Sequence, residues 1–376
     1  MQLVHCLLLT MAFLTIAASS GFAADAVVVA EASAPHAPQQ PQLAISPQGV
    51  VHLAFGANDD IQYARSEDGR KSFSPPVKLD TVRVLSLGIR RGPRIAVSGN
   101  AVCISVIGGQ QGKGKDGDVL LYRSDDQGDT WEEPVIVSDA PDSAREGLHA
   151  MAASAKGELT CVWLDLRNKN TEIFASTSVD GGKSWSKNVL AYRSPSGSVC
   201  ECCHPSVTYA PDGTLHVMWR NSLAGQRDMY HAVSKDSGKS FGKAQKLGIG
   251  SWPLDSCPMD GGNLAILSDG KLATTWRRDK TVYFHGGGMA KEVELGPGEQ
   301  PWIAATKEGP IAVWLRKRGE ALMLRQPRSQ AVELAKSAGD PVIAAGGPKN
   351  EVVVAAWEVH QGGHRKIVCQ RIESVR

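Results

Sequence analysis

The sequence predicts an all-β fold built from one unit repeated along the chain. Two observations predict it: a turn motif occurs four times at near-equal spacing, and short β-branched or aromatic segments lie before and after each copy. The chain has 376 residues, 42% of them hydrophobic and 21% charged, which is enough to bury a large core. Its formal net charge of +2 shows no footprint of a nucleic-acid partner, and we expect none.

The N-terminus predicts export. An apolar run from Leu7 to Ala18 is followed by small residues, with Gly21 and Ala23 at the −3 and −1 positions of a cleavage site. This pattern is typical of a secretory signal peptide over residues 1–23, which leaves 24–376 as a single domain. No later segment approaches the roughly 18 apolar residues of a membrane span. We therefore expect a periplasmic or extracellular protein without a membrane span.

The repeated motif is Ser-x-Asp-x-Gly-x-Ser/Thr-Trp/Phe, and the first copy carries its glycine one position early, at Gly69. Glycine takes the positive φ of a tight hairpin, and the Asp and Ser oxygens accept hydrogen bonds from turn N–H groups. The closing aromatic ring packs between neighbouring sheets. We therefore expect a structural role for the four aspartates, which are spaced by 58, 54 and 56 residues: Asp68, Asp126, Asp180 and Asp236.

These motifs resemble the Asp-boxes, or bacterial-neuraminidase repeats, of sialidase-like propellers. The resemblance covers Pro41 to about Leu247 and implies a β-propeller of four-stranded antiparallel blades. The C-terminal third lacks the motif but keeps a strand, a glycine turn and a strand ending in Trp276, Trp314 or Trp357. Counting second strands predicts seven blades, with residues 26–32 supplying the strand that closes the ring. Six blades, the number in sialidases, is the alternative.

Blade topology places the unusual loops on one face, opposite the Asp-box hairpins. These loops join second to third strands, or one blade to the next, and they are rich in arginine. Arginine suits bidentate capture of carboxylate, sulfate or phosphate, although pairing with acidic residues at the blade rim is the alternative. The candidate substrate-binding residues are Arg91, Arg145, Arg167, Arg220, Asn221, Arg277, Arg316, His149, His204 and Asp260.

The same face supplies candidate catalytic carboxylates. Sialidases use an aspartate as acid/base and a Tyr–Glu pair as nucleophile, but this sequence lacks their Arg-Ile-Pro motif and offers no tyrosine to assign. Loop position alone makes Asp165 or Glu146 the candidate acid. We therefore expect a glycoside hydrolase if the protein is an enzyme.

Residues 199–205, VCECCHP, form a cysteine-rich loop between the third and fourth units. An exported protein meets oxidising conditions, so a disulfide from Cys200, Cys202 or Cys203 to Cys257 in the next between-blade loop is the first interpretation. A copper or zinc site and a catalytic thiol are the alternatives. Cys103, Cys161 and Cys369 lie within strands and are expected to be buried. The loop is similar to one in exported bacterial sialidase-like proteins that carry Cys-x-Cys-Cys-x-Pro.

Two functions follow as hypotheses. The first is an exported sialidase-like propeller that recognises, and as an enzyme would hydrolyse, an anionic or polar glycan at the arginine-rich face, without a cofactor. The second is a non-catalytic binding or assembly module, whose cysteine loops hold copper or zinc or contact a protein partner. A glycosidase needs two carboxylates about 5 to 10 Å apart beside a sugar pocket, whereas a binding module needs only the arginines or the thiols.

Overall fold

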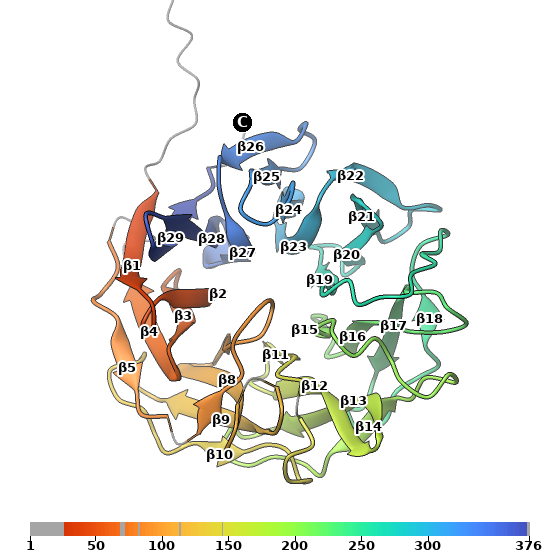
Figure 1. The fold of residues 1–376 in the computed structure, drawn as a ribbon, viewed down its shortest axis with the longest axis horizontal. Coiled ribbons are helices and arrows are strands. Elements are labelled where there is room, and N and C mark those ends of the chain that lie inside the picture. The colour runs from red at the N-terminus through yellow and green to blue at the C-terminus, as the bar shows by residue number, and fades with distance from the viewer. Residues whose placement is uncertain (1–25, 68–71, 82, 113, 145, 374–376) are drawn as a thin grey trace, which may run out of the picture.

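The computed structural model describes residues 26–67, 72–81, 83–112, 114–144 and 146–373. These residues form seven antiparallel sheets arranged as blades around a central axis (Figure 1). The predicted all-β propeller is confirmed, with seven blades rather than six. One 3-10 turn, Pro348–Asn350, lies within the last blade.

The first three blades span the N-terminal half of the ring. Blade 1 contains β2 (Pro38–Ile45), β3 (Val51–Ala57), β4 (Asp60–Ser66) and β5 (Val77–Leu79). Blade 2 contains β6 (Val84–Leu85), β7 (Arg94–Ser98), β8 (Ala101–Gly109), β9 (Asp118–Ser124) and β10 (Val135–Ile136). Blade 3 contains β11 (His149–Ala153), β12 (Leu159–Asn168), β13 (Asn170–Ser178) and β14 (Val189–Tyr192).

The remaining blades complete the circle. Blade 4 contains β15 (Ser206–Tyr209), β16 (Leu215–Arg220), β17 (Met229–Ser234) and β18 (Gln245–Lys246). Blade 5 contains β19 (Asn263–Ile266), β20 (Leu272–Arg278), β21 (Thr281–Gly286) and β22 (Val293–Pro297). Blade 6 contains β23 (Glu299–Thr306), β24 (Gly309–Leu315), β25 (Leu322–Arg325) and β26 (Val332–Ala335). Blade 7 contains β27 (Gly339–Gly346), β28 (Val352–Gln361), β29 (His364–Arg371) and β1 (Val27–Ser33).

The N-terminal strand closes the ring, as predicted. β1 is the outer strand of blade 7 and pairs antiparallel with β29, with Val27 opposite Cys369 and Ser33 opposite His364 (Figure 1). The first and last strands of the described chain therefore share one sheet, so the two ends of the chain hold each other in register.

The Asp-boxes form the same hydrogen-bonded turn in blades 2, 3 and 4. In blade 3 the Asp180 carboxylate accepts from Ser178 Oγ at 2.7 Å and from the Ser184 N–H at 2.9 Å. The Ser178 hydroxyl in turn accepts from the Gly182 N–H at 2.8 Å. Asp126 and Asp236 make the equivalent bonds. Asp126, Asp180 and Asp236 thus each hold a hairpin turn by hydrogen bonds, whereas Asp68 lies outside the described residues.

These hydrogen bonds also stabilise the ionised carboxylates. For Asp236, bonds from Ser240 and Ser234 hold the pKa at about 2, below its usual range. Partial burial opposes the shift at Asp180, yet bonds from Ser184 and Ser178 still lower that pKa to about 2. These two carboxylates are therefore charged at neutral pH.

The Asp-box glycines pack against the preceding blade. Gly128 has φ +95°, and a Cβ on it would overlap the ring of Tyr63 in blade 1. Gly182 approaches Leu121 of blade 2 in the same way, where a Cβ would lie 2.6 Å from a leucine methyl group. Gly213 has a similar φ of +88°, but no atom lies within 4 Å of the place that its Cβ would take. Substitutions at Gly128 and Gly213 can therefore separate the effect of backbone strain on stability from the effect of packing between blades.

We expect Gly128→Ala to lower the free energy of unfolding by about 3 kcal/mol, and Gly213→Ala by about 1 kcal/mol. Both variants place an L side chain at positive φ, but only Gly128→Ala forces a methyl group into the Tyr63 ring. Urea unfolding of the two variants and the wild type measures the difference. Equal losses of unfolding free energy in the two variants would show that the close packing of Gly128 against Tyr63 does not contribute to stability.

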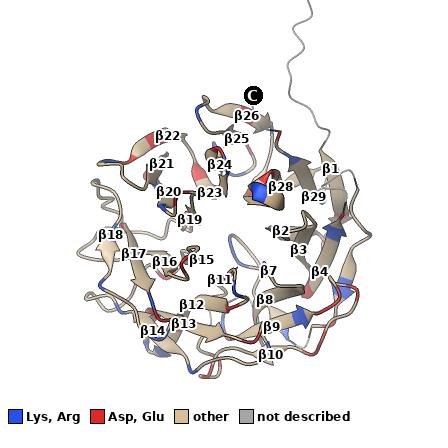
Figure 2. Cartoon of the chain, turned by 180° about the vertical axis from the view of Figure 1, so that it is seen from behind, with Lys and Arg blue, Asp and Glu red and all other residues tan. Residues whose placement is uncertain are grey.

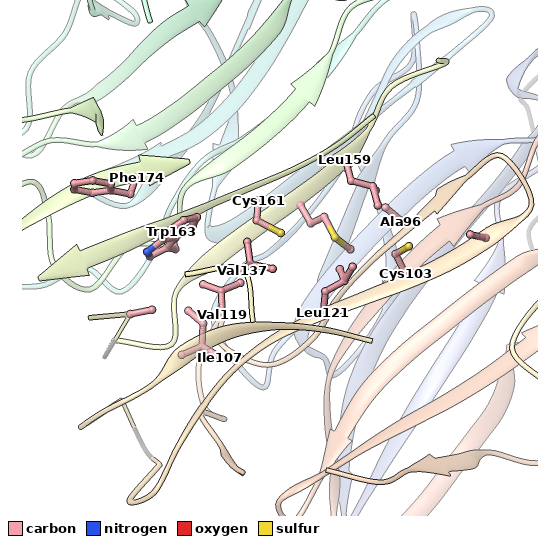
Figure 3. Close-up of a cluster of buried hydrophobic side chains, with 13 residues drawn as sticks. Ala96, Cys103, Ile107, Val119, Leu121, Val137, Leu159, Cys161, Trp163 and Phe174 are labelled. Carbon is pink, nitrogen blue, oxygen red and sulfur yellow. The ribbon is translucent and has the colours of Figure 1, made fainter. Parts of the chain in front are cut away.

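Apolar cores fill the spaces between blades, and one tryptophan per second strand anchors several of them. The five tryptophans of β12, β16, β20, β24 and β28 are all almost fully buried: Trp163, Trp219, Trp276, Trp314 and Trp357. Between blades 2 and 3, Cys103 and Cys161 lie among Leu121, Leu159 and their neighbours (Figure 3). Burial raises the pKa of both thiols, to about 12 for Cys103. They serve as small apolar core residues, and Cys369 is buried as well.

The inner strands surround a channel along the axis with a volume of about 570 Å³. Its wall includes the small side chains Ala44, Ala96, Ala152 and Ala344, which let the seven inner strands approach one another. The turns after these strands lie on the Asp-box face, because the Asp-box hairpins connect the third and fourth strands at the same ends. The starts of the inner strands, and the between-blade loops before them, lie on the opposite face, called here the loop face.

The predicted signal peptide, residues 1–23, lies outside the described residues. Within the described part of the chain, no helix has the length and hydrophobicity needed to cross a bilayer.

Candidate functional site

Arg220 lies at the loop-face end of blade 4, where it contacts blade 5. It is the last residue of β16 and is almost completely buried. Its guanidinium donates to three main-chain carbonyls, those of Asp260 at 3.0 Å, Arg227 at 2.6 Å and Arg277 at 2.8 Å. It makes no ion pair with any other described side chain. Its positive charge is therefore stabilised by main-chain dipoles and not by a bonded carboxylate among the described residues.

Trp252 lies between two of the predicted arginines. The Arg220 guanidinium is 5.1 Å from its ring centroid and that of Arg277 is 5.5 Å away. Arg277 is 20% exposed and donates to Glu299 at 2.9 Å and to the carbonyl of Asp279 at 2.6 Å. The structure thus brings Arg220, Arg277 and the Asp260 backbone together, as the predicted site requires.

Other predicted arginines have different surroundings. Arg91 donates to the Glu146 carbonyl at 2.6 Å and lies 3.5 Å from its carboxylate. Arg316 follows β24 directly and its side chain is exposed. Arg145 lies outside the described residues. Arg91 and Glu146 therefore form a partly exposed pair, and Arg316 projects freely from the same face.

Asp165 is enclosed by donors at the blade 2–3 rim. Its carboxylate accepts from Trp163 Nε1 at 2.7 Å, Ser143 Oγ at 2.8 Å and three donors of Arg167 at 2.9 Å. Arg167 also binds Asp139 at 2.6 Å and stacks over the Phe174 ring at 4.1 Å. This geometry favours the salt-bridge alternative for Arg167 and a structural role for Asp165. The catalytic assignment of Asp165 and Glu146 stays a prediction. The two carboxylates share no partner, because Asp165 pairs with Arg167 and Glu146 pairs with Arg91.

The two predicted histidines are both buried and neutral. His149 contacts Ser105 Oγ through Nε2 at 3.1 Å, and burial lowers its pKa to about 3. His204 stacks on Trp302 at 5.8 Å, and neither ring nitrogen has a well-aligned hydrogen-bond partner. Burial, followed by the charges of nearby arginines, lowers the His204 pKa well below its usual range. Neither ring is accessible to a ligand from outside.

Asn221 is buried beside the cysteine loop. Its side-chain nitrogen donates to Tyr192 Oη at 2.9 Å, and its backbone bridges to Val199. The side-chain oxygen has no partner among the described residues. Asn221 therefore holds the loop in place and leaves one acceptor unused next to it.

Buried polar residues near the axis, called here the axial polar ring, connect blades 5, 6, 7, 1 and 2, and sequence reasoning singled out only Asp260 among them. The N–H groups of Gln300, Asp340 and Gln40 each donate to a side chain of the preceding blade, and the Arg90 N–H of blade 2 donates to Asp340 of blade 7. Figure 2 shows basic and acidic segments next to each other beside β28, close to the axis. The members are Gln40, Arg90, Asp260, Gln300, Asp340 and Glu358.

The bonds of the axial polar ring are short and directional. The Gln300 N–H donates to Asp260 at 2.8 Å and the Asp340 N–H to Gln300 at 3.2 Å, while the Gln40 N–H donates to Glu358 at 2.7 Å. Burial raises the pKa of Asp260 and, together with Glu358, that of Asp340. Buried acids held this way fasten one blade to another and are closed to substrate.

A signal for this ring was present in the sequence. Asp260, Gln300 and Asp340 are spaced by 40 residues, and the latter two are the second residues of inner strands and directly precede a proline. Both have positive φ, 54° and 43°, a strained conformation for residues with a side chain. The inter-blade hydrogen bonds offset that strain, which is why polar residues occur there.

Three thiols of the cysteine-rich loop gather at one point. The sulfur atoms of Cys200, Cys202 and Cys203 all lie within 4.8 Å of one another. Hydrogen bonds between the thiols, and then Arg220 and Arg227, lower the Cys200 pKa, while the pKa values of Cys202 and Cys203 are raised. Cys257 is exposed and outside this group, and all seven described cysteines are free thiols. The predicted disulfide to Cys257 is therefore not formed here.

The loop also contains Cys-x-x-Cys-His, with Cys200, Cys203 and His204, which is the spacing of c-type haem attachment. The residues do not fit a porphyrin. All three are buried, Trp302 covers the imidazole, and a Cβ on Gly261 would lie 2.6 Å from its Nδ1. The enclosed imidazole and thiols therefore do not support haem attachment at this motif.

Comparison with known proteins agrees with the fold. Residues 106–274, which span blades 2 to 5, match the BNR repeat-like domain. No curated protein matches the chain. The chain is thus similar to a repeat family over nearly half of its length, and the resemblance of its Asp-boxes is confirmed.

Solved structures share the architecture at low identity. An α-L-arabinanase of Penicillium chrysogenum complexed with arabinobiose has a TM-score of 0.56 and 14% identity, covering 92% of this chain and 97% of that one. A leech intramolecular trans-sialidase has a TM-score of 0.53 and 11% identity over 94% and 70% of the two chains. An ulvan lyase bound to -[GlcA(1-4)Rha3S]- has a TM-score of 0.56 and 12% identity over 91% and 95%. These likenesses show the fold.

Proposed function

We propose, for a BNR propeller of seven blades, that the loop face binds an anionic glycan bearing uronate or sulfate groups. The observation that carries the proposal is that arginines recur where second strands of successive blades end at the loop face. Arg277 is the penultimate residue of β20 in blade 5 and is partly exposed, and Arg316 directly follows β24 in blade 6 and is exposed. Cations repeated from blade to blade match a polymer whose charges are also repeated.

The solved neighbours support a glycan as the ligand class. One was determined with arabinobiose and another with -[GlcA(1-4)Rha3S]-, a repeat that carries both a carboxylate and a sulfate. Because identity is low, these ligands are not carried over to particular residues. The arginines of this chain supply the reason for choosing an anionic rather than a neutral glycan.

The geometry supports recognition better than hydrolysis. A glycosidase needs two carboxylates about 5 to 10 Å apart facing one sugar. Asp165 instead accepts five hydrogen bonds at the rim, and Glu146 is paired with Arg91. Binding requires only cationic groups at the surface, which the exposed Arg316 and the partly exposed Arg277 supply. We further infer that the protein works outside the cytoplasm, since residues 1–23 have the pattern of a signal peptide.

We expect the double variant Arg277→Gln/Arg316→Gln to bind polygalacturonate, a carboxylated polymer, about tenfold more weakly than the wild type. Wild-type affinity should also fall as salt is raised, because exposed charges are screened. Calorimetric titration measures both effects, with neutral arabinan as the control polymer. Melting curves confirm that the variant is folded.

Arg328→Gln is the matched control, because Arg328 is also exposed but lies between β25 and β26 on the Asp-box face. It removes the same charge from the opposite side and should leave affinity within a factor of two. Equal binding by the double variant and the wild type, or tighter binding of arabinan than of polygalacturonate, would refute the proposal.

A further inference from the structure

The three thiols of the 199–205 loop are arranged around a common point. The Cys200 sulfur is 3.5 Å from that of Cys203 and 3.8 Å from that of Cys202. A metal bound about 2.3 Å from each of three sulfurs sets them roughly 3.8 to 4.0 Å apart. Two sides of the sulfur triangle are therefore close to those of a three-thiolate metal site, and the third, from Cys202 to Cys203, is at most 4.8 Å.

The backbone holds this triangle in place without a metal. The Cys200 N–H donates to the carbonyl of Arg220 at 3.0 Å, and the Val199 N–H to that of Thr171 at 2.9 Å. The Val199–Asn221 bridge ties the loop to the end of β16. One side of the loop is thus fixed to blade 3 and the other to blade 4, so the thiols need little ordering before a ligand binds.

Access is provided by one thiol. Cys200 and Cys203 are buried, whereas Cys202 is partly exposed. A metal ion can therefore be transferred to Cys202 first and then completed by the two buried sulfurs. Burial of those two shields the bound ion from water and from oxidants.

The electrostatic surroundings favour a monovalent ion. Three thiolates carry three negative charges, and one Cu(I) leaves a net charge of −2. Arg220 and Arg227 are neighbours of the loop: the Cys200 N–H donates to the Arg220 carbonyl at 3.0 Å, and the Arg220 guanidinium donates to the Arg227 carbonyl at 2.6 Å. Their two positive charges balance a Cu(I) tris-thiolate, whereas a divalent ion would leave an excess positive charge in a buried site.

We propose that Cys200, Cys202 and Cys203 form a Cu(I) site on the loop face, with Arg220 and Arg227 compensating its charge. Soft thiolate ligands select Cu(I), and three-coordination suits it, whereas Zn²⁺ prefers four ligands. Cys257 is the only other described cysteine outside a strand, and it is not part of the group. The site is independent of Arg277 and Arg316, so glycan binding and metal binding can fail separately.

The test is an anaerobic Cu(I) titration of the reduced full-length protein against the chromophoric chelator bicinchoninate. We expect one tightly bound Cu(I) per chain. Cys202→Ser should weaken binding at least tenfold, and it is expected to fold because Cys202 is partly exposed. Cys257→Ser is the matched control and should retain wild-type affinity.

Three results of the metal titrations would overturn the proposal. One is equal Cu(I) affinity in the wild type and Cys202→Ser, and another is loss of binding in Cys257→Ser, which would indicate a different thiol set. The third is a higher affinity of the protein for Zn²⁺ than for Cu(I) when the two ions compete. Thiol counting on the protein as isolated complements the titration: a Cys200–Cys203 disulfide that resists reduction under native conditions also excludes the site.

Discussion

Replacing Asp165 by alanine is expected to lower the free energy of unfolding by about 3 to 5 kcal/mol, because it leaves a partly buried cation and two buried donors without their acceptor. The donors are Trp163 Nε1 and Ser143 Oγ, and the cation is Arg167, which keeps only Asp139 and Asn188 as partners. Asp165 is 0% exposed, so water cannot replace the lost oxygen atoms. Urea unfolding followed by tryptophan fluorescence measures this loss.

Asp139→Ala is the control for this experiment. It removes a second carboxylate from the same guanidinium, but Asp139 is 44% exposed and its loss is expected to cost no more than about 1 kcal/mol. Comparable losses in the two variants would contradict a special structural role for Asp165. If the Asp165→Ala protein kept wild-type stability but lost activity toward a glycan, the result would favour a catalytic role for Asp165.

Lowering the pH from 7 to 4 is expected to reduce the free energy of unfolding by about 3 kcal/mol through His149 alone. Burial lowers the pKa of this histidine from 6.5 to about 3, so it stays neutral in the folded protein at pH 4. The unfolded chain takes up the proton from about pH 6.5 downward. Protonation therefore favours the unfolded state increasingly between pH 6.5 and 3, and stability falls as the pH falls.

His149→Gln isolates this contribution. Glutamine can still contact Ser105 but does not titrate, so the variant should lose less stability than the wild type between pH 7 and 4. The comparison is needed because burial also lowers the pKa of His52 and His231 to about 4. His364→Gln, at an exposed position, should retain the wild-type slope. Parallel pH–stability curves for His149→Gln and the wild type would contradict the assignment.

Much of the fold follows from local rules that can be read in the chain. The Asp-box combines an acceptor, a hydroxyl and a glycine within a few residues, and its hydrogen bonds in blades 2 to 4 are those its composition requires. The strand–turn–Trp rhythm predicts seven blades and the closure by residues 26–32, because every blade must bury its apolar residues against the next. These interactions connect neighbours in sequence or successive repeats.

The candidate site could be located on one face from the sequence, but the partners of each charged residue could not be predicted. Arg167 and Arg220 both lie near the loop-face ends of the second strands of adjacent blades. Arg167 pairs with Asp165, whereas the Arg220 guanidinium donates to three main-chain carbonyls and contacts the Trp252 ring. Likewise, the sequence places Cys257 and Cys202 in adjacent loops, but only Cys202 joins the thiol group.

The sequence by itself determined the β-propeller repeat, the Asp-box turns and the face that carries the arginine and cysteine loops, because these depend on periodicity and short-range hydrogen bonding. Only the tertiary structure decided which of those arginine and cysteine side chains are buried and which are exposed. It also decided that Gln300 and Asp340 join the axial polar ring. The free energy of a charge or thiol depends on burial and on atoms within a few ångströms. In a propeller those atoms belong to other blades, 40 or more residues away in the chain.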